Sequence, residues 1–304
     1  MKWINVGALS LFDLSNDVEQ VSMKDTDKDV REALNILQAD YCLQCKTSSS
    51  YFVKNTLPES CTEIWFSFDF TQTGRNDQLA SLLLSFGNSL PHIEMHKDGA
   101  IQILSPSNEL LYDNGSIHPW FGVNRNVEVH IKTGENGRVD IWGDTKFVMS
   151  YRSPSAFVGN IATIRIEGGV KYNVASLYFA HFILQDTRRI GLEKFKKLTI
   201  EPDIEQNMPQ GSTTTYRLSG LSDSTEFSDI TSVCAVLQAT SRDANITTGT
   251  FSLEGADVGT IDVSDSSGRA YEIAHAEVNS LTSKPWTRAD IEGKTLSFKV
   301  NGAS

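Results

Sequence analysis

The chain has 304 residues, enough for two domains of ordinary size that each bury a hydrophobic core. Its formal net charge of −11 argues against binding nucleic acid through the phosphates, because such binding needs a basic surface. Hydrophobic residues make up 39% of the chain, and no apolar run approaches the ~20 residues that a transmembrane helix needs. We therefore expect a globular protein that binds no nucleic acid and does not insert into a membrane.

The first sixty residues predict one strand and one short helix. The apolar part of residues 3–12 is too short for a signal peptide, and we interpret it as a first β-strand. Four apolar residues then recur at the spacing of one helix face, namely Val30, Ala33, Leu34 and Leu37. We expect the first strand to pair beside the last strand of its domain, because this pairing covers an edge that would otherwise be open.

Residues 61–186 predict a long series of strands with almost no helix. In the first strand, apolar side chains alternate with polar ones and with Trp65, at positions Ile64, Phe66, Phe68 and Phe70. This alternation is typical of a half-buried strand, because successive side chains leave opposite faces of the pleat. Further strands are predicted at residues 80–86, 92–96, 101–104, 126–133, 138–142, 146–151, 162–167 and 176–184.

Many short strands joined by hairpin turns predict an all-β fold, an antiparallel jelly-roll or concanavalin-like sandwich over residues 1–187. Residues 188–212 carry polar and chain-breaking residues and are interpreted as a linker. Residues 213–304 predict a smaller β-sandwich domain, with strands at 214–218, 232–240, 249–253, 270–278 and 294–300. One helical turn is predicted near residue 288, with Thr287 as N-cap and Asp290 at its third position.

The four cysteines do not define a metal site. Cys42 and Cys45 have the spacing of zinc and redox motifs, but zinc takes four ligands and Cys61 would be only the third. Buried or free thiols, made in a reducing cytoplasm, are the simpler interpretation. A disulfide between two of these three residues stays open, and the state of Cys234 is equally undetermined.

The sharpest cluster of metal-binding residue types is His92, Glu94 and His96. On a strand these side chains share one face, and two imidazoles with a carboxylate can bind a divalent cation. An ordinary polar sheet face explains the same pattern, and we favour it. No cofactor and no metal are predicted.

Glycoside cleavage needs two carboxylates that face each other across a sugar. No strand carries acidic residues so arranged: Asp140 and Asp144 bracket a turn, and Glu63 and Asp69 are far apart along their strand. No nucleophile elbow, phosphate-binding loop or dinucleotide fingerprint is present in the sequence either. We therefore predict that the protein is not an enzyme, and we assign no catalytic residue.

Carbohydrate binding is the stronger possibility. Trp65, Trp120 and Trp142 offer flat apolar faces for sugar rings, unless they pack between the sheets as large aromatic residues often do. Trp142 breaks the alternation just before a tight turn and is predicted to be exposed. Trp142, Trp120 and Asp144 are therefore the candidate glycan contacts.

Several segments resemble, in order, those of a family of tailed-bacteriophage virion proteins with an N-terminal laminin-G or concanavalin-like jelly roll and a smaller β domain. The hairpin at 126–134 (NVEVHIKTG) and 137–144 (GRVDIWGD) is similar to theirs, although Gly143 and Asp144 reverse the usual turn order. The strand at 174–187 ends in Asp-Thr like their last strand, with Ala180 and His181 in place of an acidic pair. Residues 191–202 and 285–291 resemble their connector and a Pro-Trp-Thr segment.

The resemblance implies a non-enzymatic structural component of a virion, in the tail, collar or capsid surface, made in the host bacterial cytoplasm. Its implied partners are other virion proteins and further copies of itself, as a homo-oligomer. The alternative is a glycan- or receptor-binding adhesin module of a tail fibre or spike, with a host-surface glycan as partner. A polysaccharide-cleaving tail enzyme is the third hypothesis.

Overall fold

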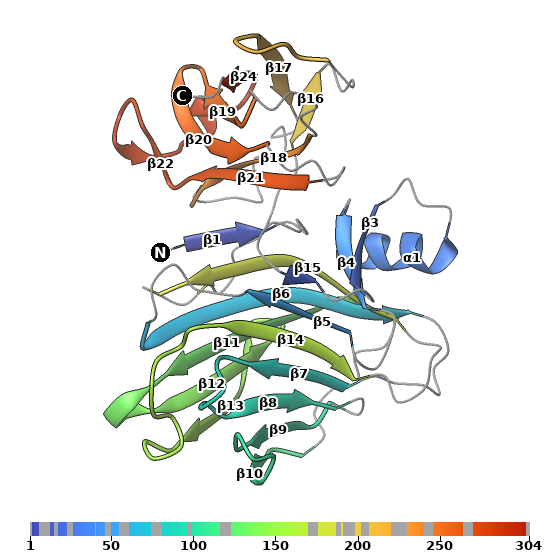
Figure 1. Ribbon diagram of the computed structural model, residues 1–304, viewed down its shortest axis with the longest axis vertical. Helices are drawn as coiled ribbons and strands as arrows, with labels where there is room; N and C mark the ends of the chain where they lie inside the picture. The colour runs from blue at the N-terminus through green and yellow to red at the C-terminus, as the bar shows by residue number, and fades with distance from the viewer. Residues whose placement is uncertain are drawn as a thin grey trace. The chain divides into compact units, whose positions relative to one another are not determined.

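The computed structural model divides the chain into two compact units, unit 1 (Met1–Leu192) and unit 2 (Glu193–Ser304) (Figure 1). Each unit is described by itself below. The described residues are 2–5, 13–14, 18–22, 27–39, 41–45, 50–54, 61–73, 81–96, 99–115, 123–169, 176–186, 190, 198–201, 207–219, 230–239, 246–263 and 270–301.

Unit 1 contains two antiparallel sheets. Sheet A has the strand order β13-β12-β11-β6-β15-β4-β3, and β1 also pairs with β15. Its strands are β1 (Lys2–Asn5), β3 (Val18–Ser22), β4 (Tyr41–Cys45), β6 (Glu63–Thr73), β11 (Arg125–Lys132), β12 (Arg138–Gly143), β13 (Lys146–Arg152) and β15 (Ser176–Gln185). A short 3₁₀ turn, Gly134–Asn136, joins β11 to β12.

Sheet B has the strand order β10-β9-β8-β7-β14-β5-β2. Its strands are β2 (Asp13–Leu14), β5 (Ser50–Lys54), β7 (Ser81–Ser85), β8 (His92–Met95), β9 (Ile101–Leu104), β10 (Leu110–Asp113) and β14 (Ile164–Gly169). The antiparallel sandwich predicted from the sequence is confirmed. Every strand predicted between residues 80 and 184 is present within a few residues of its expected bounds.

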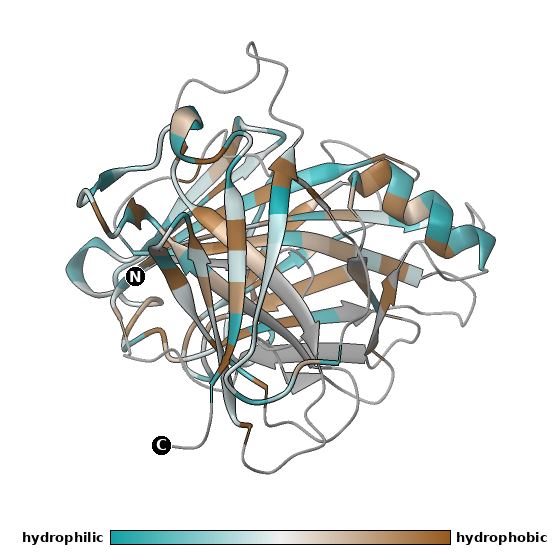
Figure 2. Cartoon of the chain, turned by 90° about the horizontal axis from the view of Figure 1, so that it is seen from above, coloured by the Kyte–Doolittle hydropathy of each residue, from teal (hydrophilic) through white to brown (hydrophobic). Residues whose placement is uncertain are grey.

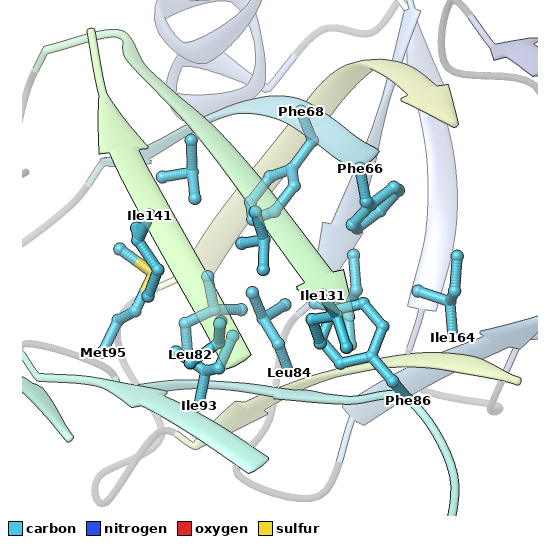
Figure 3. Packing of buried hydrophobic residues seen from close by; sticks show 14 of the residues in the cluster. Phe66, Phe68, Leu82, Leu84, Phe86, Ile93, Met95, Ile131, Ile141 and Ile164 are labelled. Atoms are coloured by element: carbon cyan, nitrogen blue, oxygen red, sulfur yellow. The ribbon is translucent and has the colours of Figure 1, made fainter. Parts of the chain in front are cut away.

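One hydrophobic core lies between the two sheets, and the alternation in β6 creates its largest part. Ile64, Phe66, Phe68 and Phe70 are all at most 1% exposed, as predicted. Figure 3 shows Phe66 and Phe68 of β6 with aliphatic residues of β7, β8, β11 and β12 in this core. Because one face of β6 is committed to the core, its other face is fixed on the outside of sheet A.

The predicted helix is confirmed as α1 (Lys28–Leu37). It begins after Asp27, whose side chain accepts a hydrogen bond from the backbone N–H of Asp29, and it ends at Gln38 in the left-handed conformation. The four apolar residues predicted to share a face are all buried, and α1 carries both brown and teal residues in Figure 2. They pack against Tyr178, Ala180 and Cys42, so α1 covers one end of the outer face of sheet A.

The predicted pairing of the first and last strands of unit 1 is also confirmed. β1 runs antiparallel to β15, with Lys2 opposite Gln185 and Asn5 opposite Phe182. Of the strand expected at residues 3–12, the structure describes the beginning as β1 (Lys2–Asn5), and residues 6–12 lie outside the described part of the chain.

Unit 2 is also built from strands. Its main sheet has the order β16-β17-β24-β19-β20, and two further pairs are β18-β21 and β22-β23. The strands are β16 (Thr199–Glu201), β17 (Thr213–Ser219), β18 (Val233–Ala239), β19 (Thr248–Leu253), β20 (Ala256–Asp262), β21 (Ala270–Ala276), β22 (Val278–Asn279), β23 (Lys284–Pro285) and β24 (Thr295–Asn301). β16 lies inside the stretch 188–212 that the sequence suggested as linker.

The core of unit 2 is centred on aromatic residues. Phe251 and Phe298 pack with ring centroids 4.7 Å apart, and buried Trp286 donates its indole N–H to the carbonyl of Ala276. The predicted turn is a 3₁₀ turn, Arg288–Asp290, with the expected capping box between Thr287 and Asp290. Within the described ranges of both units, no helix is long and apolar enough to cross a membrane.

Candidate functional site

The outer face of sheet A carries a row of side chains that crosses four strands. His130 of β11 lies opposite Trp65 of β6 on one side and opposite Asp140 of β12 on the other. Asp140 in turn lies opposite Ser150 of β13. Because the neighbouring residues in each strand face the core, these four side chains share the outer face. We call Trp65, His130, Asp140 and Ser150 the histidine row.

His130 is held on both sides by carboxylates. Its Nδ1 lies 2.9 Å from Oδ2 of Asp140, and its Nε2 lies 2.8 Å from Oε1 of Glu63. The imidazole is fully buried and stacks on the indole of Trp65, with ring centroids 3.8 Å apart and an interplanar angle of 7°. Both ring nitrogens of His130 are therefore engaged by carboxylate oxygens.

The two carboxylates have further cationic partners. Lys132 Nζ lies 2.7 Å from Oε2 of Glu63, and Arg138 Nε lies 3.0 Å from Oδ2 of Asp140. Ser150 Oγ donates to the other oxygen of Asp140 at 2.6 Å. Burial alone would raise the pKa of both carboxyl groups. Hydrogen bonds from Lys132 and His130 to Glu63, and from His130 and Ser150 to Asp140, outweigh burial, so both pKa values are lowered.

Beside the histidine row lies a group of aromatic side chains that reaches solvent. Trp142 of β12 contacts Trp65 with ring centroids 5.5 Å apart and Phe147 of β13 with centroids 5.7 Å apart. Phe147 is 60% exposed, and Trp142 is half-buried. The pairing of β12 with β13 shifts between Ile141 and Trp142, an irregularity of the kind that redirects side chains. We call Trp65, Trp142 and Phe147 the aromatic patch.

Asp144 and Trp120 are the other two residues predicted to contact a glycan. Asp144 lies in the turn after β12 with φ of 49°, where it pairs with Arg125 and accepts a hydrogen bond from the backbone N–H of Asn126. Asp144 therefore stabilises the hairpin that presents Trp142. Trp120 lies outside the residues that the structure describes.

A second polar group lies further along the same face. Asp69 of β6 accepts hydrogen bonds from Nδ2 of Asn126 at 2.8 Å and, at the same distance, contacts Nδ1 of His181. His181 interrupts β15 with a φ of 56°, a left-handed conformation uncommon for residues other than glycine. The paired Asp69 anchors this bulge to the neighbouring strand.

Ile190, a described residue beyond β15, is hydrogen-bonded to the outer face of sheet A. The backbone N–H of Ile190 donates to Oε1 of Glu128 at 2.7 Å, and both residues are buried. Glu128 of β11 lies opposite Trp142 of β12, so Ile190 lies over the outer face next to the aromatic patch. Among the described residues, α1 and Ile190 therefore cover parts of this face outside the aromatic patch.

His92 and His96, in and just after β8 of sheet B, contact amide side chains at the surface. His92 and Glu94 point away from the core on β8, and His96 follows the end of that strand. Nε2 of His92 contacts Asn108, and Nε2 of His96 contacts Gln102 at 3.0 Å. Among the residues that the structure describes, no three His, Cys, Asp or Glu side chains are placed to hold a metal ion.

No disulfide bond joins the four cysteines within the described part of the chain. Cys42 and Cys45 stand three residues apart on β4, so their side chains leave opposite faces of the strand. Cys42 packs under α1, whereas Cys45 lies in the core between the sheets, where burial raises the pKa of its thiol. This geometry separates the two thiols that the CxxC spacing brings together in sequence.

The sequence did not reveal the convergence of Glu63, His130 and Asp140, because the three residues come from three strands. The alternation of polar and apolar residues along each strand gave only a weak indication of this polar face. Glu128, His130 and Lys132 alternate with apolar residues on one strand, as Glu63 and Asp140 do on theirs. Strand order and register, which the sequence alone does not provide, bring these polar faces together.

Comparisons with known proteins give structural similarity only. No family model matches the chain, and no curated protein matches it. Among solved structures, it is similar to an endo-β-1,4-glucuronan lyase from the fungus Trichoderma reesei, at 12% identity and a TM-score of 0.44 over 61% of this chain and 95% of that one. It is also similar to the lectin UEA-II complexed with galactose (9% identity, TM-score 0.38, 61% and 98% covered) and to an alginate lyase from Aplysia kurodai (8%, 0.41, 60% and 98%). Similarity at this level says nothing about what this chain binds or catalyses.

Proposed function

We propose that unit 1 is a glycan-binding module whose ligand lies on the aromatic patch. The observation that carries this proposal is the contact between half-buried Trp142 and exposed Phe147, beside a row of hydrogen-bonded polar side chains. A sugar ring presents an apolar face, which an indole or phenyl ring can cover, and hydroxyl groups, which polar side chains can bind. The β12–β13 hairpin supplies two of the aromatic rings. The histidine row supplies polar side chains, held in place by hydrogen bonds, beside them.

We further propose that binding is not followed by catalysis. Glycoside cleavage uses one carboxylic acid that stays protonated near neutral pH to donate its proton. Hydrogen bonds to His130 and Lys132 lower the pKa of Glu63, and those to His130 and Ser150 lower the pKa of Asp140. Both groups are therefore ionised and fully engaged at neutral pH, which suits a structural support rather than a proton donor.

Replacing Trp142 with alanine is expected to weaken glycan binding by about tenfold or more, because the stacking surface is removed. A glycan array would identify a ligand, and titration followed by tryptophan fluorescence would give its dissociation constant. The control is Tyr112→Ala, which removes a partly exposed aromatic ring from β10 of the other sheet. Equal affinity of wild-type and Trp142→Ala protein would contradict the proposed site, and the lack of any ligand would contradict the proposed function.

A second proposal concerns where this module works. We propose that the chain is a component of a tailed-bacteriophage virion, made in the host bacterial cytoplasm, where it contacts other virion proteins and copies of itself. The resemblance to virion proteins of several segments, in order over about residues 120–300, supports this. So do the outer strands β10 and β13, each of which ends its sheet and carries an exposed apolar residue, Leu110 and Phe147 respectively.

Purified full-length protein is expected to form a defined oligomer, because chains that build a particle associate with copies of themselves. Light scattering coupled to size-exclusion chromatography would measure the mass, and mass spectrometry of purified particles would test incorporation. Leu110→Lys places a charge on the β10 edge and is expected to reduce association, whereas Lys299→Gln in unit 2 serves as a surface control. A strictly monomeric protein that is missing from particles would contradict the proposal.

A further inference from the structure

Three cations lie in register on the outer face of sheet A. Lys132 of β11 pairs across the sheet with Arg138 of β12, and Arg138 pairs with Arg152 of β13. These positions are two residues from the histidine row on each strand, so the three side chains share its face. We call Lys132, Arg138 and Arg152 the cationic row.

This arrangement carries an electrostatic cost. Side chains directly opposite each other in antiparallel strands lie within about 5.5 Å at Cβ, and like charges there destabilise the sheet. Glu63 neutralises Lys132, and Asp140 lies within ion-pair distance of Arg138. Arg152 is exposed and has no ion pair among the described residues. The chain as a whole has a net charge of −11, so this group of cations is a local exception.

Arg138 is also incompletely satisfied. Its Nε is buried and 3.0 Å from Oδ2 of Asp140, yet the N–H is not directed so as to form a hydrogen bond. Asp140 already receives hydrogen bonds on both oxygens, from His130 and from Ser150. The Arg138 side chain is 31% exposed and Arg152 is exposed, so both side chains reach solvent, and guanidinium groups suit planar, bidentate recognition of anions.

The cationic row and the aromatic patch form one continuous surface. Arg138 and Trp142 lie four residues apart on the same face of β12, which is about 13 Å along a strand. Arg152 and Phe147 lie on the neighbouring strand β13, on the same side. An oligosaccharide that stacks on Trp142 and runs along β12 therefore reaches the two guanidinium groups. Asp140, which lies between Arg138 and Trp142 along β12, is only 10% exposed and is covered by its partners.

We propose that the ligand of this surface is an anionic glycan, whose carboxylate or sulfate groups bind Arg138 and Arg152 while its rings stack on the aromatic patch. This inference rests on the glycan-binding function proposed above and adds the chemical class of the ligand. The anion supplies the charge that the like-charged pair lacks, so ligand binding relieves the repulsion between the two arginines.

The test compares three ligands of equal length: a uronic-acid oligosaccharide, a sulfated oligosaccharide and a neutral glucose oligosaccharide. Calorimetric titration of the full chain is expected to give tighter binding of at least one anionic ligand than of the neutral one, with affinity falling as salt rises. Arg152→Gln is expected to weaken anionic binding about tenfold and to leave neutral binding unchanged. Lys299→Gln, an exposed lysine on β24 of unit 2, is the control for the same change in net charge.

The outcomes separate this inference from the function on which it rests. The anionic ligand that responds to Arg152→Gln identifies the group recognised, a carboxylate or a sulfate. Preference for the neutral ligand, or equal affinities of wild-type and Arg152→Gln protein, overturns the inference and leaves glycan binding intact. Failure of all three ligands and of a broader array overturns the proposed function, and the inference with it. Equal melting temperatures of the variants would show that lost binding is not lost folding.

Discussion

Replacing Phe68 with alanine is expected to lower the free energy of unfolding of unit 1 by about 3–5 kcal/mol, the range found for large aromatic residues in well-packed cores. Phe68 is fully buried at the centre of β6. Four other phenylalanine rings surround it, with centroids 5.4–6.1 Å away, those of Phe66, Phe70, Phe179 and Phe182. Because these rings belong to two strands of the same sheet, they cannot collapse into the cavity without moving the sheet.

Urea unfolding followed by far-ultraviolet circular dichroism would measure this loss, with unit 2 providing a separate transition if the units unfold independently. Phe147→Ala is the matched control, because it removes the same side chain from a position that is 60% exposed. Its effect should stay near 0.5 kcal/mol, as for most surface substitutions. Similar losses for the two variants would mean that Phe68 is not in a close-packed core.

Replacing His130 with leucine is expected to destabilise unit 1 by about 3–5 kcal/mol at neutral pH, although leucine fits a buried position. The imidazole bridges Glu63 and Asp140 and is itself fully buried. Without it, Asp140 keeps its charge at a site that is 10% exposed and loses one of its hydrogen-bond donors. The same substitution also removes the ring that stacks on Trp65.

The size of this effect should depend on pH in a predictable direction. The pKa values of Glu63 and Asp140 are lowered in the folded protein, so their interactions stabilise it above the ordinary carboxyl pKa values, near 4. As pH falls through the lowered folded values, this contribution disappears. The difference between wild-type and His130→Leu protein should therefore be largest near pH 7 and shrink in acid. His92→Leu, on the outer face of sheet B, should show a small difference without this dependence.

Much of the fold could be predicted because one face of each main strand is committed to the core. The alternation around Phe68 and the helical spacing of Leu34 and Leu37 correspond directly to the side chains that are buried in the structure. The sequence did not predict strands in which apolar and polar residues alternate less regularly. β20 (Ala256–Asp262) contains Gly259 at a φ of 141°, against Ala274, and β4 (Tyr41–Cys45) is buried on both faces and therefore shows no alternation.

The candidate site could be predicted only in part, because most of its contacts join residues of different strands. Trp142 was identified because it breaks a local pattern, and the structure places it at a partly exposed position beside Phe147. The contacts of His130 depend on which strands are neighbours and on their register. Both follow from long-range packing of the sheet, and a single strand holds no information about either.

The pairing of β1 with β15 also affects how the protein is made. Lys2 lies opposite Gln185, so the contact that completes this part of sheet A joins residues from the two ends of unit 1. On a ribosome that adds 5–20 residues per second, β15 is synthesised roughly 10–40 s after β1. During that time its hydrogen-bonding edge is unpaired, so the nascent chain depends on chaperones or on its own neighbouring segments to avoid wrong partners.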